Sequence, residues 1–224
     1  MGDSPSDVSR ETVRAPDPAV AALVFAPDRL PGLERYAALL ATDGVVRGLI
    51  GPREVPRLWD RHLLNCGLLS PLIAAGAAVV DLGSGAGLPG MVLAIARPDL
   101  RVTLVEPMAR RVSFLEEVCA ELGLVTVEVV RARAESLAAE RRFDVVTARA
   151  LAPLSRLLGW AWPLVAEDGV LLAMKGSSAA AEISSARPDL RRLRARAEVV
   201  TCSVPGSSVT TVVRVVGGRT AGIG

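Results

Sequence analysis

The chain has 224 residues, of which half are hydrophobic and 22% are charged. This composition supplies a core for one sizeable domain and excludes global disorder. No apolar run approaches the roughly 18 residues of a membrane-spanning helix. Residues 1–17 also lack the apolar segment of a secretory signal, so we expect a cytoplasmic protein with no membrane partner. A net charge of +2 is too small to indicate a nucleic-acid partner by itself.

Cysteine, histidine and lysine are all scarce in this chain. Its three cysteines are widely separated, which favours buried thiols over disulfides or a zinc site, and we expect no metal. Lys175 is the single lysine among 26 basic residues, and His62 is the single histidine. Because the chain is so biased toward arginine, these two positions are of special interest.

The N-terminal part of the chain reads as helical. Residues 1–17 and 217–224 are expected to be loose tails, and residues 18–75 an N-terminal helical extension. Apolar residues recur there at positions i, i+3, i+4 and i+7 of a helix. The clearest such stripe is Leu33, Tyr36, Ala37 and Leu40.

After residue 76 the pattern changes to short β-branched runs that alternate with helical segments. The expected strands are 78–83, 101–107, 124–130, 143–149, 169–176, 197–204 and 210–216. The expected helices between them are 88–97, 108–122, 151–165 and 178–196. This alternation predicts an α/β domain over residues 76–216 with a mostly parallel seven-stranded sheet. Because no convincing helix separates the last two strands, we expect an antiparallel hairpin at one edge.

A glycine-rich turn between the first strand and the next helix is the strongest local signal. Its sequence, DLGSGAGLPG (81–90), allows a tight turn and close approach of a ligand to the backbone. Glu106 ends the second strand, where a carboxylate accepts hydrogen bonds from both hydroxyls of a ribose.

Two cofactors fit this turn, and a purely structural turn is a third reading. Gly85, Gly87 and Gly90 match the dinucleotide pattern G-x-G-x-x-G. Asp81, Gly83 and Gly85 begin the acid-x-G-x-G-x-G pattern of S-adenosylmethionine sites. An anionic pyrophosphate disfavours a nearby carboxylate, whereas a sulfonium cofactor with an amino group favours one. Asp81 therefore favours S-adenosylmethionine over a nicotinamide cofactor.

Further segments extend this signal along most of the chain. They are LWDRHLLNC (58–66), DLGSGAGLPGMVLAIARPDL (81–100), LVEPMARRVSFL (104–115), RARAE (131–135), TARA (147–150) and MKG (174–176). In order and spacing they resemble the RsmG (GidB) family of bacterial 16S ribosomal RNA methyltransferases. The resemblance implies a Rossmann-like class I S-adenosylmethionine-dependent methyltransferase fold. It also implies methyl transfer to nitrogen-7 of a guanosine near the decoding site, in the small ribosomal subunit or an assembly intermediate.

The resemblance also implies roles for individual residues. Besides Asp81 and Gly85, Gly83 and Leu88 would line the cofactor site, and Glu106 would hold the ribose. Ala134 and Glu135 would bracket the adenine. Arg149, at the end of the fourth strand, would lie beside cofactor and substrate. The family has Ser where this chain has Ala148, and many members have Asn-Leu-Thr at positions 48–50, which read Gly-Leu-Ile here.

The chemistry implied needs no acid or base. Guanine nitrogen-7 carries an in-plane lone pair and no proton, so attack on a sulfonium methyl group requires alignment instead. Arg149 and Lys175 are the candidates for positioning the substrate. The alternatives are an ion pair of Arg149 with a carboxylate and a solvated Lys175. For His62, packing between segments is favoured over substrate contact, and Trp160 and Trp162 are expected in the core.

Clustered arginines suggest an RNA surface. Arg53, Arg57 and Arg61 are four apart, which would align them on one face of a regular helix. Phosphate contact and a solvated face both stay open for this group, whereas a second group between residues 187 and 196 is typical of a solvated face. Three other functions stay open at this point: a methyltransferase for a small molecule or protein, a nicotinamide oxidoreductase, and a non-catalytic ribosome assembly factor.

Overall fold

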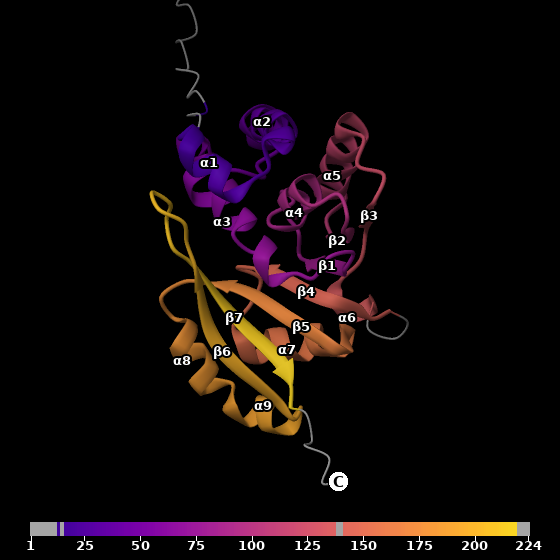
Figure 1. Ribbon diagram of the computed structural model, residues 1–224. Helices are drawn as coiled ribbons and strands as arrows, with labels where there is room; N and C mark the ends of the chain where they lie inside the picture. The colour runs from indigo at the N-terminus through magenta and orange to yellow at the C-terminus, as the bar shows by residue number, and fades with distance from the viewer. Residues whose placement is uncertain (1–12, 14–15, 138–140, 219–224) are drawn as a thin grey trace, which may run out of the picture.

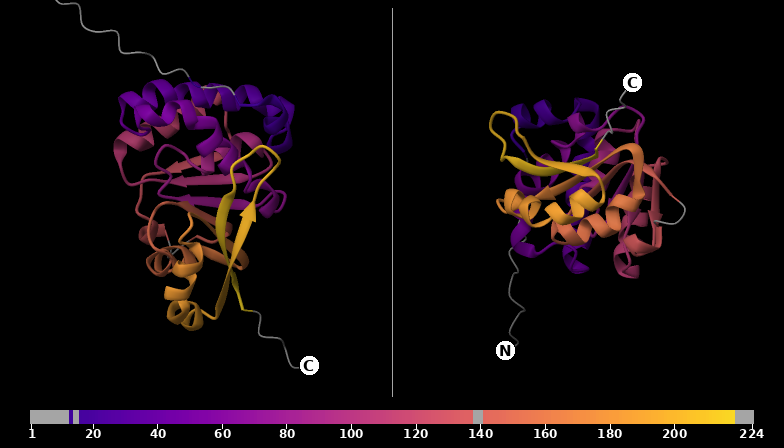
Figure 2. Two further views of the ribbon diagram at one scale, coloured as in Figure 1. Left: turned by 90° about the vertical axis from the view of Figure 1, so that its left-hand side faces the viewer. Right: turned by 90° about the horizontal axis from the view of Figure 1, so that it is seen from below.

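A central sheet with helices on both faces forms three layers (Figure 1). The computed structural model describes residues 13, 16–137 and 141–218, so most of the two predicted tails lies outside the described residues. A side view places the N-terminal helices on one face of the sheet and the helices of the C-terminal half on the other (Figure 2).

The sheet has seven strands in the order β3-β2-β1-β4-β5-β7-β6. They are β1 (Ala78–Leu82), β2 (Arg101–Val105), β3 (Val127–Val130), β4 (Phe143–Arg149), β5 (Val165–Lys175), β6 (Ala195–Cys202) and β7 (Thr210–Gly217). Strands β1 to β5 pair in parallel, whereas β7 is antiparallel to both β5 and β6. The predicted mostly parallel sheet with an antiparallel edge hairpin is confirmed.

The helical segments follow the predicted order along the chain, but they begin and end at different residues from those predicted. The α-helices are α1 (Pro18–Val24), α2 (Leu30–Leu39), α3 (Leu64–Gly67), α4 (Gly90–Ala96), α5 (Ala109–Leu122), α6 (Ala134–Leu137), α7 (Leu154–Ala161), α8 (Ala179–Ser185) and α9 (Arg187–Arg192). Short 3₁₀ helices are Pro27–Arg29, Pro52–Arg57, Ser70–Leu72 and Trp162–Leu164, and π-helical turns are Leu40–Gly44 and Leu58–Leu63.

Two hydrophobic cores lie on opposite faces of the sheet, because successive side chains of a strand point to opposite sides. Val79 of β1 packs with α2, α4 and α5, whereas its neighbour Val80 packs with α6, α7, α8 and α9. The predicted apolar stripe is confirmed, since Leu33 and Tyr36 of α2 and Leu40 of the π-helical turn after it are fully buried in the first core. Trp160 and Trp162 are half-buried against the second core.

Several predicted boundaries were wrong for identifiable reasons. The predicted helix 178–196 is two short helices, because Pro188 restricts the residue before it and separates α8 from α9. The predicted helix 151–165 begins only at Leu154, after Pro153, and turns into a 3₁₀ helix at Trp162. The fifth strand starts earlier than expected, at Val165, because Phe143 pairs with it before a β-bulge.

The helical alignment expected for the three spaced arginines was also wrong. Arg53 and Arg57 lie in a 3₁₀ helix, and Arg61 lies in the following π-helical turn. Neither geometry has 3.6 residues per turn, so a spacing of four does not place the side chains on one stripe. All three side chains are nevertheless exposed.

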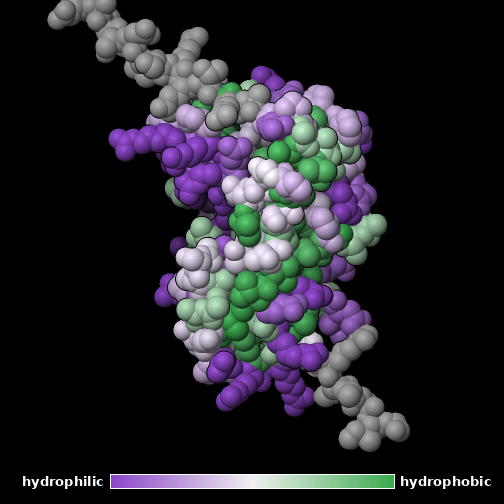
Figure 3. All heavy atoms as spheres, turned by 60° about the vertical axis from the view of Figure 1, so that its left-hand side comes forward, coloured by the Kyte–Doolittle hydropathy of each residue, from purple (hydrophilic) through white to green (hydrophobic). Residues whose placement is uncertain are grey.

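The antiparallel hairpin of β6 and β7 forms one edge of the sheet, next to β5. Val199 of β6 is 41% exposed, and the space-filling view of this side has a band of hydrophobic residues between hydrophilic groups (Figure 3). Thr210 at the start of β7 donates a hydrogen bond to the Asn65 carbonyl, 3.2 Å away, which ties the hairpin to α3. In the described part of the chain, no helix is both long and apolar enough to cross a membrane.

Candidate active site

The glycine-rich turn connects β1 to α4 at the carboxyl edge of the sheet. Gly83, Gly85 and Gly87 all have positive φ angles, of 67°, 59° and 99°. Residues with a Cβ rarely adopt this backbone conformation. A Cβ on Gly85 would meet no atom nearer than 3.8 Å, so the backbone faces open space there. The hydroxyl of Tyr36 in α2 braces the turn by donating to the Ala86 carbonyl at 2.6 Å.

Glu106 follows β2 directly and lies beside the turn. Its carboxylate oxygens accept hydrogen bonds from the backbone N–H of Gly85 and of Met108, each at 3.0 Å. Arg111 is 3.5 Å from the same carboxylate. Glu106 is almost completely buried, so its position is fixed, and with Gly85, Met108 and Arg111 as donors about one of its four acceptor sites remains for a ligand hydroxyl.

Asp81 lies near the end of β1, just before the turn, and is fully buried. Its Oδ2 accepts the N–H of Gly90 at 3.1 Å, whereas its Oδ1 has no hydrogen-bond partner. Burial raises the pKa of this carboxyl to about 7, and the hydrogen bond from Gly90 offsets part of that effect. A buried carboxylate oxygen without a partner fits a nearby cationic ligand group, reached directly or through water.

The remaining predicted cofactor residues lie along the same edge. Ala134 and Glu135 begin α6, just after β3, and only Glu135 is exposed. Leu88 is buried in the first core. The open backbone at Gly85, the fixed carboxylate of Glu106 and the unpartnered Asp81 oxygen fit the sugar and amino group of S-adenosylmethionine. Their direct contacts with it stay a prediction.

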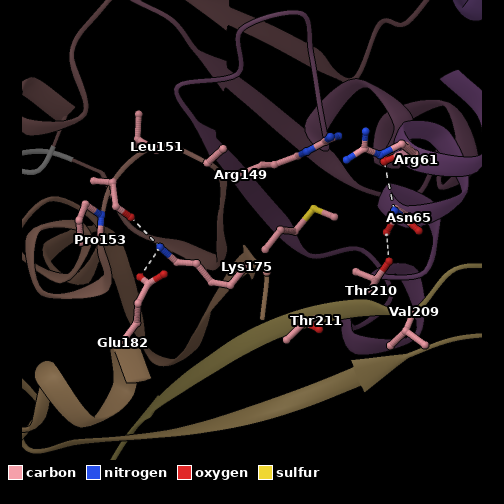
Figure 4. Close-up of a pocket in the computed structure, with 14 residues that line it drawn as sticks. Arg61, Asn65, Arg149, Leu151, Pro153, Lys175, Glu182, Val209, Thr210 and Thr211 are labelled. Atoms are coloured by element: carbon pink, nitrogen blue, oxygen red, sulfur yellow. Dashed lines mark hydrogen bonds and ion pairs between the residues drawn. The ribbon is translucent and has the colours of Figure 1, made fainter. Parts of the chain in front are cut away.

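A cavity of about 860 Å³ opens next to this turn (Figure 4). It is lined by Arg61, Asn65, Arg149, Ala150, Leu151, Ala152, Pro153, Met174, Lys175, Gly176, Glu182, Val209, Thr210 and Thr211. Leu151 joins the cavity to the turn, because a Cβ built on Gly83 would lie 2.6 Å from its Cδ1. The cavity therefore has the place that a substrate beside the cofactor requires.

Lys175 ends β5 and lines this cavity, but its side chain is only 8% exposed. Its Nζ donates to the Ala152 carbonyl at 2.6 Å and pairs with Glu182 at 2.7 Å. Glu182 also accepts the N–H of Leu154. Lys175 is therefore not the solvated lysine of the alternative reading, and it braces the loop after β4 while one N–H remains for a ligand.

Arg149 ends β4 and points across the cavity toward the π-helical turn (Figure 4). Its Nη2 donates to Nδ1 of His62 at 2.6 Å, and its Nη1 donates to the sulfur of Cys66 at 3.7 Å. His62 Nε2 in turn lies 2.9 Å from Glu54. We call these three residues, Glu54, His62 and Arg149, the Glu-His-Arg relay.

Sequence reasoning missed three contributors to this site. Glu54 and Glu182 are the partners of His62 and Lys175, and each lies in a neighbouring helix of the chain, eight and seven residues away. Thr210 belongs to the edge hairpin. A carboxylate near the chain position of His62 was the one available signal, whereas nothing in the sequence links residues 175 and 182 to the loop after β4. In the residues that the structure describes, no group of three His, Cys, Asp or Glu could hold a metal ion.

The strand order, the glycine-rich turn after β1 and the acid after β2 define an S-adenosylmethionine-dependent methyltransferase of Rossmann-like fold. The chain is similar to an S-adenosylmethionine-dependent O-methyltransferase from Thermotoga maritima, with a TM-score of 0.53 and 14% identity over 69% of this chain and 65% of that chain. A precorrin-6y C5,15-methyltransferase from Geobacter metallireducens gives a TM-score of 0.52 and 16% identity over 68% and 87%. At these identities the likeness shows the fold alone.

Sequence comparison resolves the family. The family model described as rRNA small subunit methyltransferase G (GidB) matches residues 29–209, and the chain belongs to this family. Proteins named ribosomal RNA small subunit methyltransferase G from Nocardioides sp. and Thermobifida fusca are 66% identical over 212 residues and 56% over 202. These alignments cover 94% and 88% of this chain, and 84% of each relative. The resemblance inferred from the motifs is confirmed.

Proposed function

We propose that this chain transfers a methyl group from S-adenosylmethionine to nitrogen-7 of a guanosine in 16S ribosomal RNA, near the decoding site. Family membership supports the ribosomal RNA substrate class. The observation that carries the proposal within the molecule is the cavity beside the glycine-rich turn, because Arg149 and Lys175 both line it. A small-subunit substrate also favours the cytoplasm as its place of action.

The cofactor half of the site is the turn and its two buried acids. Glu106 would accept the ribose hydroxyls, and Asp81 would face the amino group. Ala134 and Glu135 would bracket the adenine, and Gly83 and Leu88 would line the pocket. The bound cofactor supplies an activated methyl group on a sulfonium. These residues hold and orient it through hydrogen bonds and charge.

The substrate half suits a nucleophile that carries no proton. Glu182 lines the cavity and His62 contacts Arg149 in its wall, and both acid–base groups are already engaged by a cation. Neither is free to remove a proton. Guanine nitrogen-7 needs only to be held in line with the methyl carbon and the leaving sulfur, which is what a cavity walled by fixed donors achieves.

Exposed arginines extend the site outward. Arg61 lines the cavity, and Arg53 and Arg57 lie exposed in the segment before it. Guanidinium groups pair well with phosphate, so this segment fits the RNA backbone around the target base. Because the chain has only seven Phe, Trp and Tyr residues in all, base stacking contributes little, and recognition depends on folded RNA in the subunit.

The test is methyl transfer from labelled S-adenosylmethionine to small ribosomal subunits from cells that lack this activity. We expect label in 16S RNA, mapped to nitrogen-7 of one guanosine, and weaker transfer to protein-free RNA. Label on another atom or base would overturn the assignment of nitrogen-7. Absence of label in subunits and in their assembly intermediates would overturn the RNA substrate. Binding of NADH in place of S-adenosylmethionine, measured by calorimetry, would overturn the cofactor.

A further inference from the structure

The guanidinium of Arg149 is held by a histidine ring and a thiol instead of by a carboxylate. In the residues that the structure describes, no carboxylate lies within ion-pair distance of its guanidinium, and its contacts are His62 Nδ1 at 2.6 Å and Cys66 Sγ at 3.7 Å. Burial raises the pKa of Cys66 to about 12, so this partner is a neutral thiol. The positive charge of Arg149 is therefore left for a ligand.

The contact with Arg149 determines which nitrogen of His62 carries the proton. A guanidinium has donors and no acceptor, so Nδ1 must accept and carries no hydrogen. The remaining nitrogen, Nε2, then carries the hydrogen and donates it to Glu54 Oε2 at 2.9 Å. The side chain of His62 is buried between the two partners, and both ring nitrogens are used.

We propose that His62 is a positioning residue for methyl transfer: held by Glu54 as the neutral Nε2–H tautomer, it acts through Nδ1 to aim the Arg149 guanidinium into the substrate cavity. Arg149 so held would engage an anionic or carbonyl oxygen of the bound nucleotide. The effect on turnover rests on the proposed function above, whereas the tautomer and the aim of Arg149 do not.

The charges around His62 favour this state. Glu54 faces it from the 3₁₀ helix, Arg149 from the end of β4, and Arg61 from its own π-helical turn. Burial and the charge of Arg149 lower the pKa of His62, against the opposing effect of Glu54. A protonated ring would turn an N–H toward Arg149 and replace a hydrogen bond with repulsion between two cations.

The first test reads the tautomer directly. His62 is the only histidine of the chain, so full-length protein grown with ¹⁵N-labelled histidine gives nitrogen signals of one ring. We expect a pyridine-like Nδ1 and a protonated Nε2 at neutral pH. We also expect a marked change of the Nδ1 signal in Arg149→Ala. An Nδ1–H tautomer, a doubly protonated ring, or a signal unmoved by Arg149→Ala would overturn the proposal.

The second test separates the two nitrogens by substitution. In His62→Asn the amide oxygen stands near the place of Nδ1 and can still accept from Arg149. In His62→Gln the amide reaches the place of Nε2 and keeps only the contact with Glu54. If the aim of Arg149 matters, His62→Gln loses about 100-fold in kcat and His62→Asn only about tenfold. Equal losses, or the opposite order, would overturn the proposal.

The readouts keep this proposal apart from the proposed function. Melting temperature and S-adenosylmethionine affinity are measured for each variant, and we expect both to stay near those of the parent. If the parent chain transfers no methyl group to small subunits, the proposed function fails while the nitrogen spectrum still decides the tautomer. If the parent is active and the spectrum shows another tautomer, only the role of His62 is overturned.

Discussion

The two halves of the active site are built in different ways. The cofactor half is local, because Asp81, the glycine-rich turn and Glu106 lie within one β-α-β unit and are joined by backbone N–H groups. The substrate half is assembled from distant segments, because its relay joins Glu54 and His62 to Arg149, and its edge comes from the β6–β7 hairpin. The cofactor half therefore depends on the backbone conformation of one turn, whereas the substrate half depends on individual side-chain contacts between segments that are far apart in the sequence.

This difference predicts separable defects. Substitutions in the turn should change cofactor affinity, because backbone donors and the two buried acids define that half. Substitutions around the cavity should change turnover more than cofactor affinity, because side chains there face the substrate.

The largest effect is expected at Arg149, the one charged residue of the cavity that no carboxylate of the described residues neutralises. Arg149→Ala should lower kcat by about 1000-fold, as expected for loss of a fixed donor at the reacting centre. The fold should be retained, because Arg149 makes no ion pair with a described residue. The measurement is single-turnover methyl transfer to small subunits, together with the melting temperature.

A matched control for the loss of charge is Arg192→Ala in α9, whose side chain is 70% exposed and makes one ion pair with Asp189. It should change turnover by less than about twofold, because an exposed ion pair contributes little. Normal turnover of Arg149→Ala would contradict the role assigned to that residue.

The next effect tests the cofactor half. Glu106→Gln replaces one acceptor oxygen with a donor that faces the N–H of Gly85 or Met108. Affinity for S-adenosylmethionine should fall by about 10- to 100-fold, since hydrogen bonds to a charged group contribute about 1.5–3 kcal/mol each. Turnover at saturating cofactor should fall much less. Isothermal calorimetry and kinetics at several cofactor concentrations measure the two quantities.

The exposed Glu116 of α5 provides the control for this substitution. Glu116→Gln makes the same chemical change away from the turn and should leave cofactor affinity unchanged. If Glu106→Gln binds the cofactor as tightly as the parent, Glu106 does not hold the ribose.

The same division explains what could be predicted from the sequence. The succession of strands along the chain, the turn and the positions of Arg149 and Lys175 at strand ends follow from local patterns, and the structure has them. The partners of those two residues do not, because no local pattern relates Arg149 to His62 or Lys175 to the Ala152 carbonyl. The predicted alignment of the three spaced arginines on one helical face was also wrong. Pro52 and Pro56 favour a 3₁₀ helix there, whereas a spacing of four aligns side chains only in a regular α-helix.

A smaller effect is expected where structure and function overlap, at the Lys175–Glu182 pair. Glu182→Ala leaves a nearly buried lysine without its counter-charge and should lower the free energy of unfolding by about 2 kcal/mol. This is less than the roughly 3–5 kcal/mol of a fully buried pair, because the Glu182 side chain is 21% exposed. Lys175→Ala should lower RNA turnover by about tenfold while cofactor affinity changes by less than about twofold. Urea unfolding and cofactor titration measure these effects.

A double variant separates bracing from substrate contact. Lys175→Met with Glu182→Leu replaces the pair with apolar side chains of similar length and should recover most of the lost stability. Turnover should remain low if Lys175 also faces the substrate. Full recovery of turnover would reduce its role to holding the loop after β4.

The smallest effect is expected at Asp81, where the free energy of unfolding and the affinity for the cofactor should change in opposite directions. The folded-state pKa of Asp81 is raised from 3.8 to about 7. The folded protein therefore binds this proton more tightly than the unfolded chain, and stability falls as pH rises from about 4 to about 7. Asp81→Asn removes that slope and keeps an acceptor for Gly90. At pH 8 it should be more stable than the parent by about 1 kcal/mol, or about 2–4 °C in Tm, with no gain at pH 4.

Affinity for S-adenosylmethionine should fall about tenfold at pH 8 because the amino group loses a charged partner. A stability gain without loss of affinity would mean that Asp81 only supports the turn, and that the sulfonium cofactor is selected elsewhere in this half of the site.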